Sequence, residues 1–195
     1  MEKGLKMRGM ASRERVTKKK QGLILVMTGD GKGKTTAAMG SALRMIGHGK
    51  KVGMVQFFKP EAGSEERGTG ETKAMKKFGS LFRGLSFGGG FTWKTDREEN
   101  ARAVRKAWKK CCQLLRDSRC SLVILDEIHI VLRHKFLKVS EVIEALKRRP
   151  ALQHAILTGR SAPRAILRMA DLVTEMRCVK HPFERGIPAQ AGIEF

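Results

Sequence analysis

The sequence contains no tyrosine and only two tryptophans, and aromatic residues make up 6% of the chain. Proteins that hold single-stranded nucleic acids usually stack the bases on exposed aromatic rings. This chain lacks a stacking platform of that kind. Its 40 Lys and Arg against 19 Asp and Glu give a net charge of +21, which attracts polyanions. Because the excess is spread along the whole chain, we do not expect nucleic acid to be the main partner.

Cysteine is also scarce, and the four cysteines form no C-x-x-C pair. They are Cys111, Cys112, Cys120 and Cys178. This spacing predicts core thiols in a reducing compartment, and it argues against a disulfide framework or a zinc site. His129 and His134 are five positions apart, which would place them on different faces of a helix, so we expect no metal site there either.

No apolar run is long enough for a membrane span, so we predict no membrane partner. Residues 1–20 are rich in Lys and Arg and contain no apolar block, which argues against a secretory signal, and Glu2 and Glu14 argue against a mitochondrial presequence. We expect a cytoplasmic protein. Residues 1–20 cannot bury enough apolar surface to order alone, so we interpret them as a basic segment that orders only on binding. Residues 21–195 form the single predicted domain.

A glycine-rich turn between an apolar strand and a helix dominates the rest of the sequence. Leu23–Met27 is an apolar run typical of a buried strand, and a helix-forming run begins at Thr35. Between them, glycines let backbone N–H groups point inward, Lys34 supplies a cation and Thr35 offers a hydroxyl to Mg²⁺. The match is to a variant phosphate loop, because Thr28 stands where the strict pattern has glycine. The predicted nucleotide-binding residues of this stretch are Thr28, Gly29, Asp30, Gly31, Lys32, Gly33, Lys34, Thr35 and Thr36.

A second signal follows the apolar run Cys120–Leu125, which ends in Asp126 and Glu127. Carboxylates at the end of a buried strand lie where open α/β sheets bind ligands. Together with the phosphate loop, they predict a metal site formed by Thr35, Asp126 and Glu127.

The remaining pattern alternates strands and helices. Further strands are expected at 52–58, 81–87, 154–160 and 171–176, and further helices at 72–78, 96–117, 139–149 and after Pro163. The fold class is α/β, a phosphate-loop NTPase-like (RecA-like) and mostly parallel sheet flanked by helices. Gly88–Gly90 present Phe91 and Trp93, which are expected either to pack on the sheet edge or to contact a large flat ligand.

A phosphate loop does not name the reaction. A phosphate-loop ATPase or kinase, with or without a nucleic-acid partner, remains the alternative to a transferase. Six short segments, however, resemble the cob(I)alamin (corrinoid) adenosyltransferases of the cobalamin-biosynthesis type in order and spacing. They are Thr28–Ala38, Gly47–Gly53 with Val55–Phe57, Gly90–Trp93, Leu125–Glu127, Thr158–Arg160, and Val179–Phe183 with Ala189–Phe195. The family usually has Asn at position 30, where this chain has Asp, and residues 59–89 match poorly.

The resemblance implies transfer of the 5′-deoxyadenosyl group of ATP to the Co(I) of cobalamin or cobyrinic acid a,c-diamide, with release of triphosphate. Co(I) is itself the nucleophile, so no catalytic side chain is expected. The resemblance further implies that Arg44 and Arg160 bind ATP, that Phe91 and Trp93 face the corrinoid, that Mg²⁺ or Mn²⁺ accompanies ATP, and that the subunits form a homodimer. The positive charge suggests an acidic electron donor such as reduced flavodoxin.

Overall fold

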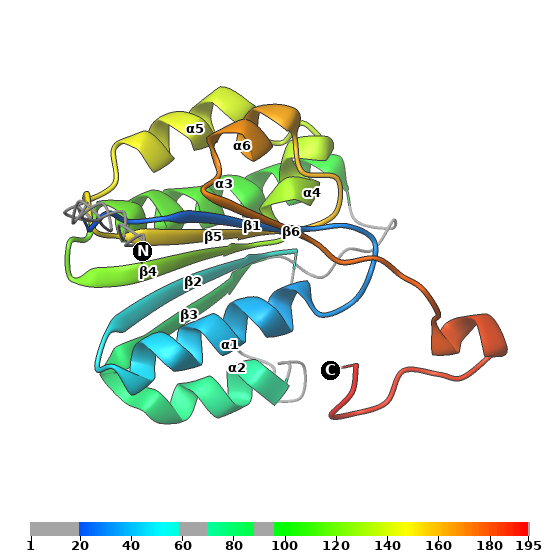
Figure 1. The fold of residues 1–195 in the computed structure, drawn as a ribbon. Coiled ribbons are helices and arrows are strands. Elements are labelled where there is room, and N and C mark those ends of the chain that lie inside the picture. The colour runs from blue at the N-terminus through cyan, green and yellow to red at the C-terminus, as the bar shows by residue number, and fades with distance from the viewer. Residues whose placement is uncertain (1–19, 59–69, 88–95, 195) are drawn as a thin grey trace, which may run out of the picture.

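The computed structural model describes residues 20–58, 70–87 and 96–194, and these residues form a three-layered α/β arrangement (Figure 1). Six strands lie in one sheet in the order β3-β2-β4-β5-β1-β6, and every pairing between neighbours is parallel. The sheet is built from β1 (Ile24–Thr28), β2 (Lys51–Phe57), β3 (Phe82–Phe87), β4 (Cys120–Asp126), β5 (His154–Thr158) and β6 (Leu172–Glu175). The predicted parallel α/β fold is confirmed.

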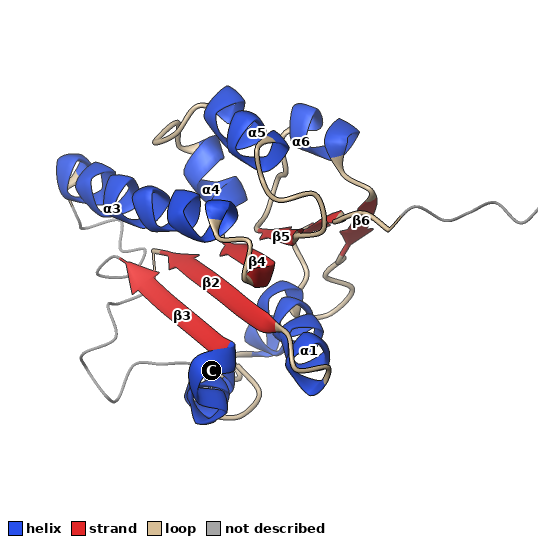
Figure 2. Cartoon of the chain, turned by 90° about the vertical axis from the view of Figure 1, so that its left-hand side faces the viewer, coloured by secondary structure: helices blue, strands red, loops and turns tan. Residues whose placement is uncertain are grey.

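Helices cover both faces of the sheet, as the turned view shows (Figure 2). One face packs against α1 (Lys34–Gly47), with α2 (Gly70–Met75) and the 3₁₀ turn η1 (Lys76–Leu81) beside it. The other face packs against α3 (Arg97–Arg116), α4 (Ile128–Arg133), α5 (Val139–Lys147) and α6 (Arg164–Met169). The central strands are apolar almost throughout because both of their faces are buried, as in β4, where Val123 and Ile124 face opposite helical layers.

The helix predictions are right in position and differ at the ends. Asp96 caps α3 by accepting a hydrogen bond from the N–H of Glu98 at 3.3 Å, which confirms the expected start. The helix predicted at 72–78 is instead split between α2 and η1, and the helical path is broken within η1 at Gly79, which has φ 53°. The short helix α4 was not predicted. It begins directly after Asp126 and Glu127, contains His129, and ends at Arg133 with His134 as its C-cap.

The cysteine prediction holds for three of the four thiols. Cys111 and Cys120 are buried and Cys112 is half-buried, and burial raises the pKa of all three. The expectation of a core position is wrong for Cys178, which is exposed in the segment that follows β6. The sequence there has no apolar period that would bury it.

The segment after β6 contains one 3₁₀ turn, η2 (Pro182–Arg185), and is exposed along most of its length. Figure 1 shows it leaving the sheet and returning toward the side on which α1 and α2 lie. Within the described residues, no helix has the length and apolar character needed to cross a membrane.

Candidate functional site

The loop that joins β1 to α1 wraps its backbone around the ammonium group of Lys34. Lys34 Nζ donates to the carbonyl oxygens of Gly29 at 2.8 Å and Gly31 at 2.5 Å. Gly29 and Gly33 have φ values of 90° and 101°, a region that side-chain-bearing residues rarely adopt, so these turns require glycine. The resulting loop, followed by the start of α1, is the arrangement that binds phosphate groups elsewhere.

The departure from the strict loop pattern at Thr28 has a local explanation. Thr28 is the last residue of β1, and its hydroxyl accepts a hydrogen bond from the N–H of Ala162 at 3.2 Å. Because the strand continues through this position, no glycine is needed there. Thr28 instead ties the phosphate loop to the loop that follows β5.

The edge strand β6 forms one wall of the loop, which the sequence did not reveal. The N–H of Gly31 donates to the carbonyl oxygen of Met176 at 2.7 Å, and the N–H of Met176 donates to that of Thr28 at 2.9 Å. A Cβ atom on Gly31 would lie 2.7 Å from the carbonyl carbon of Arg177. Gly31 is therefore required by the close approach of a neighbouring backbone.

Asp126 is fully buried at the carboxyl end of β4 and accepts hydrogen bonds from three elements. Its Oδ1 accepts from Thr35 Oγ1 at 2.9 Å and from Thr158 Oγ1 at 2.7 Å, and its Oδ2 accepts from Gln56 Nε2 at 3.0 Å. A buried carboxylate is stable only with such donors. The predicted proximity of Asp126 to Thr35 is thus found, whereas the roles of Gln56 and Thr158 were not foreseen.

Glu127 follows in a left-handed conformation, with φ 65°, and turns the chain from β4 into α4. Its N–H donates to Thr158 Oγ1 at 2.9 Å, so Thr158 bridges the two acidic residues. Non-glycine residues with positive φ cost free energy and gather at functional sites. Gly159, with φ 128°, lies against this turn, and a Cβ there would approach Glu127 Oε2 to 3.3 Å.

The charges around Lys34 show which predicted residues the fold brings together. Burial lowers the pKa of Lys34, the positive charge of Arg160 lowers it further, and the negative charges of Glu127, Asp30 and Asp126 oppose the shift. Lys34 is 8% exposed. The phosphate-loop cation, the two strand-end carboxylates and Arg160 therefore form one electrostatic group.

Other predicted residues lie at different distances from this group. Thr36, on the first turn of α1, donates to Glu71 Oε1 of α2 at 2.9 Å, and Glu71 was not singled out in the sequence. Lys32 forms an ion pair with Glu194 from the C-terminal segment. Arg44 lies ten residues beyond Lys34 on α1, about 15 Å along the helix, so the structure does not bring it to the loop. Phe91 and Trp93 lie outside the described residues.

The oxygen ligands at this edge fit a divalent cation. The Thr35 hydroxyl and the Asp126 carboxylate already lie within hydrogen-bonding distance, and the Glu127 carboxylate follows at the same strand end. Hydroxyl and carboxylate oxygens are the ligands that Mg²⁺ prefers, together with phosphate oxygens of a nucleotide. Among the described residues, no group of three His, Cys, Asp or Glu forms a separate metal cluster.

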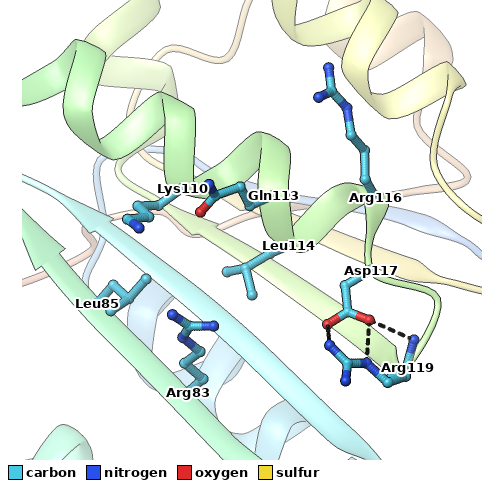
Figure 3. A pocket seen from close by; sticks show the side chains of 8 residues that line it. All are labelled: Arg83, Leu85, Lys110, Gln113, Leu114, Arg116, Asp117 and Arg119. Atoms are coloured by element: carbon cyan, nitrogen blue, oxygen red, sulfur yellow. Dashed lines mark hydrogen bonds and ion pairs between the residues drawn. The ribbon is translucent and has the colours of Figure 1, made fainter.

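A pocket of about 480 Å³ lies at the opposite end of the strands (Figure 3). Its lining residues come from β3, α3 and the turn before β4, and they are Arg83, Leu85, Lys110, Gln113, Leu114, Arg116, Asp117 and Arg119. Asp117 pairs with Arg119, which lowers the pKa of the carboxyl. This pocket is not part of the phosphate-loop site.

Residues 20–195 match the family described as ATP:corrinoid adenosyltransferase BtuR/CobO/CobP. The chain belongs to this family. It is 45% identical over 191 residues to a corrinoid adenosyltransferase of Sinorhizobium sp., a match that covers 95% of this chain and 87% of the relative. Relatives of the same name from Pseudomonas aeruginosa and Escherichia coli K12 are each 44% identical over 90% of this chain, with 84% and 86% of their own lengths covered.

The resemblance seen in the sequence is therefore confirmed, and the transferase family spans the phosphate loop, the strand-end carboxylates and the C-terminal segment. Among solved structures, the chain is similar to the RadB recombinase, with a TM-score of 0.46 and 19% identity over 83% of this chain and 77% of the other. That likeness carries no information about the reaction.

Proposed function

We propose that this transferase uses its phosphate loop to grip the triphosphate of ATP while the 5′-deoxyadenosyl group passes to a corrinoid. The observation that carries the proposal is the gathering of Lys34, Thr35, Asp126, Glu127 and Arg160 at one sheet edge in a member of this family. In the reaction, the cobalt–C5′ bond forms as the C5′–O bond breaks. Co(I) supplies the electron pair and is oxidised to Co(III), and triphosphate leaves with the pair from the broken bond.

The chain's own residues serve positioning and charge neutralisation in this scheme. Lys34, the loop amides and Arg160 hold the negative charge that grows on the triphosphate leaving group. Thr35, Asp126 and Glu127 would hold Mg²⁺ or Mn²⁺, which supplies further positive charge to the phosphate oxygens when bound. The protein also accelerates the reaction by holding the ribose C5′ in line with cobalt. It does not need to supply a nucleophile, because the Co(I) of the corrinoid substrate is the nucleophile.

The test is an anaerobic reaction of the protein with ATP and cob(I)alamin. Adenosyl transfer yields a light-sensitive cobalt–carbon compound and inorganic triphosphate in equal amounts. An ATPase or kinase would yield ADP, and a nucleic-acid-dependent ATPase would be stimulated by added DNA or RNA. ADP as the main product would overturn the proposal.

We propose that Phe91 and Trp93 contact the corrinoid. Apolar rings that displace the lower ligand of cobalt leave a four-coordinate Co(II), which is easier to reduce. Phe91→Ala and Trp93→Ala should therefore lose reduction from Co(II) while transfer to pre-reduced Co(I) largely survives. Equal losses in the two assays would contradict this division of labour.

We further propose a cytoplasmic homodimer that receives electrons from an acidic donor such as reduced flavodoxin. The net charge of +21 supports such a donor, because opposite charges accelerate the encounter. The rate of reduction by flavodoxin should then fall steeply with ionic strength. A rate that does not depend on salt would remove the donor from the scheme, and light scattering would test the dimer.

A further inference from the structure

Three polar side chains form a row across the carboxyl ends of three neighbouring strands. The strand register pairs Gln56 of β2 with Ser86 of β3 on one side and with Asp126 of β4 on the other. Residues at paired positions point to the same face of a sheet, so the register itself brings the three side chains into line. Ser86 Oγ donates to Gln56 Oε1 at 3.1 Å, and Gln56 Nε2 donates to Asp126 Oδ2 at 3.0 Å.

The row is buried at the end formed by Gln56 and Asp126. Gln56 is 2% exposed and Asp126 is fully buried, whereas Ser86 is half-buried. A buried amide must satisfy its donor and its acceptor, and here each end has a different partner. Because Ser86 donates to the amide oxygen, the amide nitrogen faces the carboxylate, which is the orientation that stabilises a negative charge.

The two oxygens of Asp126 are held from different sides. Thr35 and Thr158 donate to Oδ1, and Gln56 donates to Oδ2. The plane of the carboxylate is therefore fixed by groups on both of its edges. Because the Thr35 hydroxyl donates to Asp126, the orientation of Asp126 determines where this proposed metal ligand lies.

We infer that Gln56 is a positioning residue that orients Asp126 for nucleotide and metal binding, and that Ser86 acts through Gln56. This inference rests on the proposed use of the site for ATP but not on the identity of the acceptor. It assigns a role to a strand residue that lies in one of the segments resembling the family but was given no function from the sequence. The row also extends the site to β3, which is four positions away in the sheet order from β1, the strand that leads into the phosphate loop.

The experiment compares Gln56→Met with Gln153→Met. Methionine matches glutamine in length and cannot donate the lost hydrogen bond. Gln153 is a matched control because it is also 2% exposed, but its amide donates to the carbonyl oxygens of Leu114, Asp117 and Cys120 at the other end of the sheet. Affinity for ATP is measured by calorimetry at several Mg²⁺ concentrations without corrinoid, and thermal unfolding is followed in parallel.

Gln56→Met should weaken Mg²⁺-dependent ATP binding about 10-fold, the size expected for a hydrogen bond to a charged group. Gln153→Met should lower the melting temperature and leave ATP affinity within about 2-fold of the wild type. Ser86→Ala should weaken ATP binding about 3-fold, because Gln56 stays in place but its amide is less firmly oriented.

Asp126→Asn and the double variant with Gln56→Met test whether Gln56 acts through the carboxylate. The double variant should bind ATP as weakly as Asp126→Asn alone, because nothing remains for Gln56 to orient. Effects that multiply would overturn the inference, as would equal ATP affinities for Gln56→Met and Gln153→Met. A wild-type protein that binds ATP with Mg²⁺ and this Gln56 dependence, yet transfers no adenosyl group, would refute the proposed function and leave this inference standing.

Discussion

The two ends of the parallel sheet each contain a fully buried glutamine, and the two side chains serve different purposes. At the amino-terminal end, Gln153 donates to three backbone carbonyl oxygens around the turn that leads into β4. At the carboxyl-terminal end, Gln56 faces the carboxylate of Asp126. Arg149 also donates to three carbonyl oxygens at the first end, including that of Gly22. Gln153 and Arg149 at the amino-terminal end bind backbone carbonyl oxygens, whereas Gln56 at the carboxyl-terminal end orients a charged side chain.

The comparison shows what a buried polar residue reveals about function. A donor that meets backbone oxygens adds hydrogen bonds to a turn and so stabilises the fold itself. A donor that meets an ionised side chain stabilises a charge that the fold had no structural need to bury. The second arrangement is therefore the stronger indication of a functional site.

The largest expected effect concerns the carboxyl-terminal end. Lys34→Ala should weaken ATP binding by at least about 100-fold, because the loop loses the buried cation that we propose binds the phosphates. Calorimetric titration with ATP and Mg²⁺ measures the loss. The matched control is Lys51→Ala, an exposed lysine at the start of β2, which should bind ATP as the wild type does. Similar losses in the two variants would show that the overall positive charge, not the loop, binds ATP.

At the amino-terminal end, Gln153→Met should lower the free energy of unfolding by about 2–4 kcal/mol, because three buried or partly buried hydrogen bonds to backbone carbonyl oxygens are lost. Urea unfolding followed by circular dichroism measures this change. The loss should be greater than that for Gln56→Met, whose partner Asp126 keeps two other donors. A larger loss of stability in Gln56→Met would contradict the assignment of structural and functional ends.

An intermediate effect is expected from His129, which should make the free energy of unfolding depend on pH. Burial lowers the pKa of His129 to about 4, opposed in part by the Leu157 backbone. The unfolded chain binds this proton near pH 6.5, so the neutral buried ring stabilises the protein above that pH and the contribution is lost as the pH falls toward 4. The loss amounts to about 3 kcal/mol at most.

Urea unfolding between pH 7 and pH 4 would detect this change as a fall in the free energy of unfolding. His129→Leu should flatten the dependence over the same range, whatever its effect on the absolute stability. An unchanged slope in that variant would assign the acid sensitivity to other groups.

The smallest effect concerns the ion pair between Lys32 and Glu194. Glu194→Gln should free Lys32 and tighten ATP binding about 2-fold at low salt, with no effect at high salt, because partly exposed pairs contribute less than about 1 kcal/mol. Titration at two ionic strengths measures the difference. Weaker ATP binding in the variant would instead make Glu194 a contributor to the site.

Much of the site could be predicted because its chemistry is local in the chain. The glycines, Lys34 and Thr35 lie within one turn, and Asp126 follows an apolar run that can only be a buried strand. Arg160 was expected from a segment that resembles the family, and the charges around Lys34 place it in the same group. Glu71 and Met176 were missed because they reach the loop from α2 and the end of β6, which no local pattern connects to it.

The sequence alone determined the alternation of strands and helices, the glycine-rich loop between β1 and α1 and the family of enzymes, because these depend on neighbours in the chain. Only the tertiary structure decided that Ser86, Gln56, Asp126 and Thr158 meet at the carboxyl ends of the strands. It also decided that Gln153 binds backbone carbonyl oxygens at the amino-terminal ends. The physical reason is the strand order and register, since hydrogen bonds between strands are made by residues that lie far apart in the sequence.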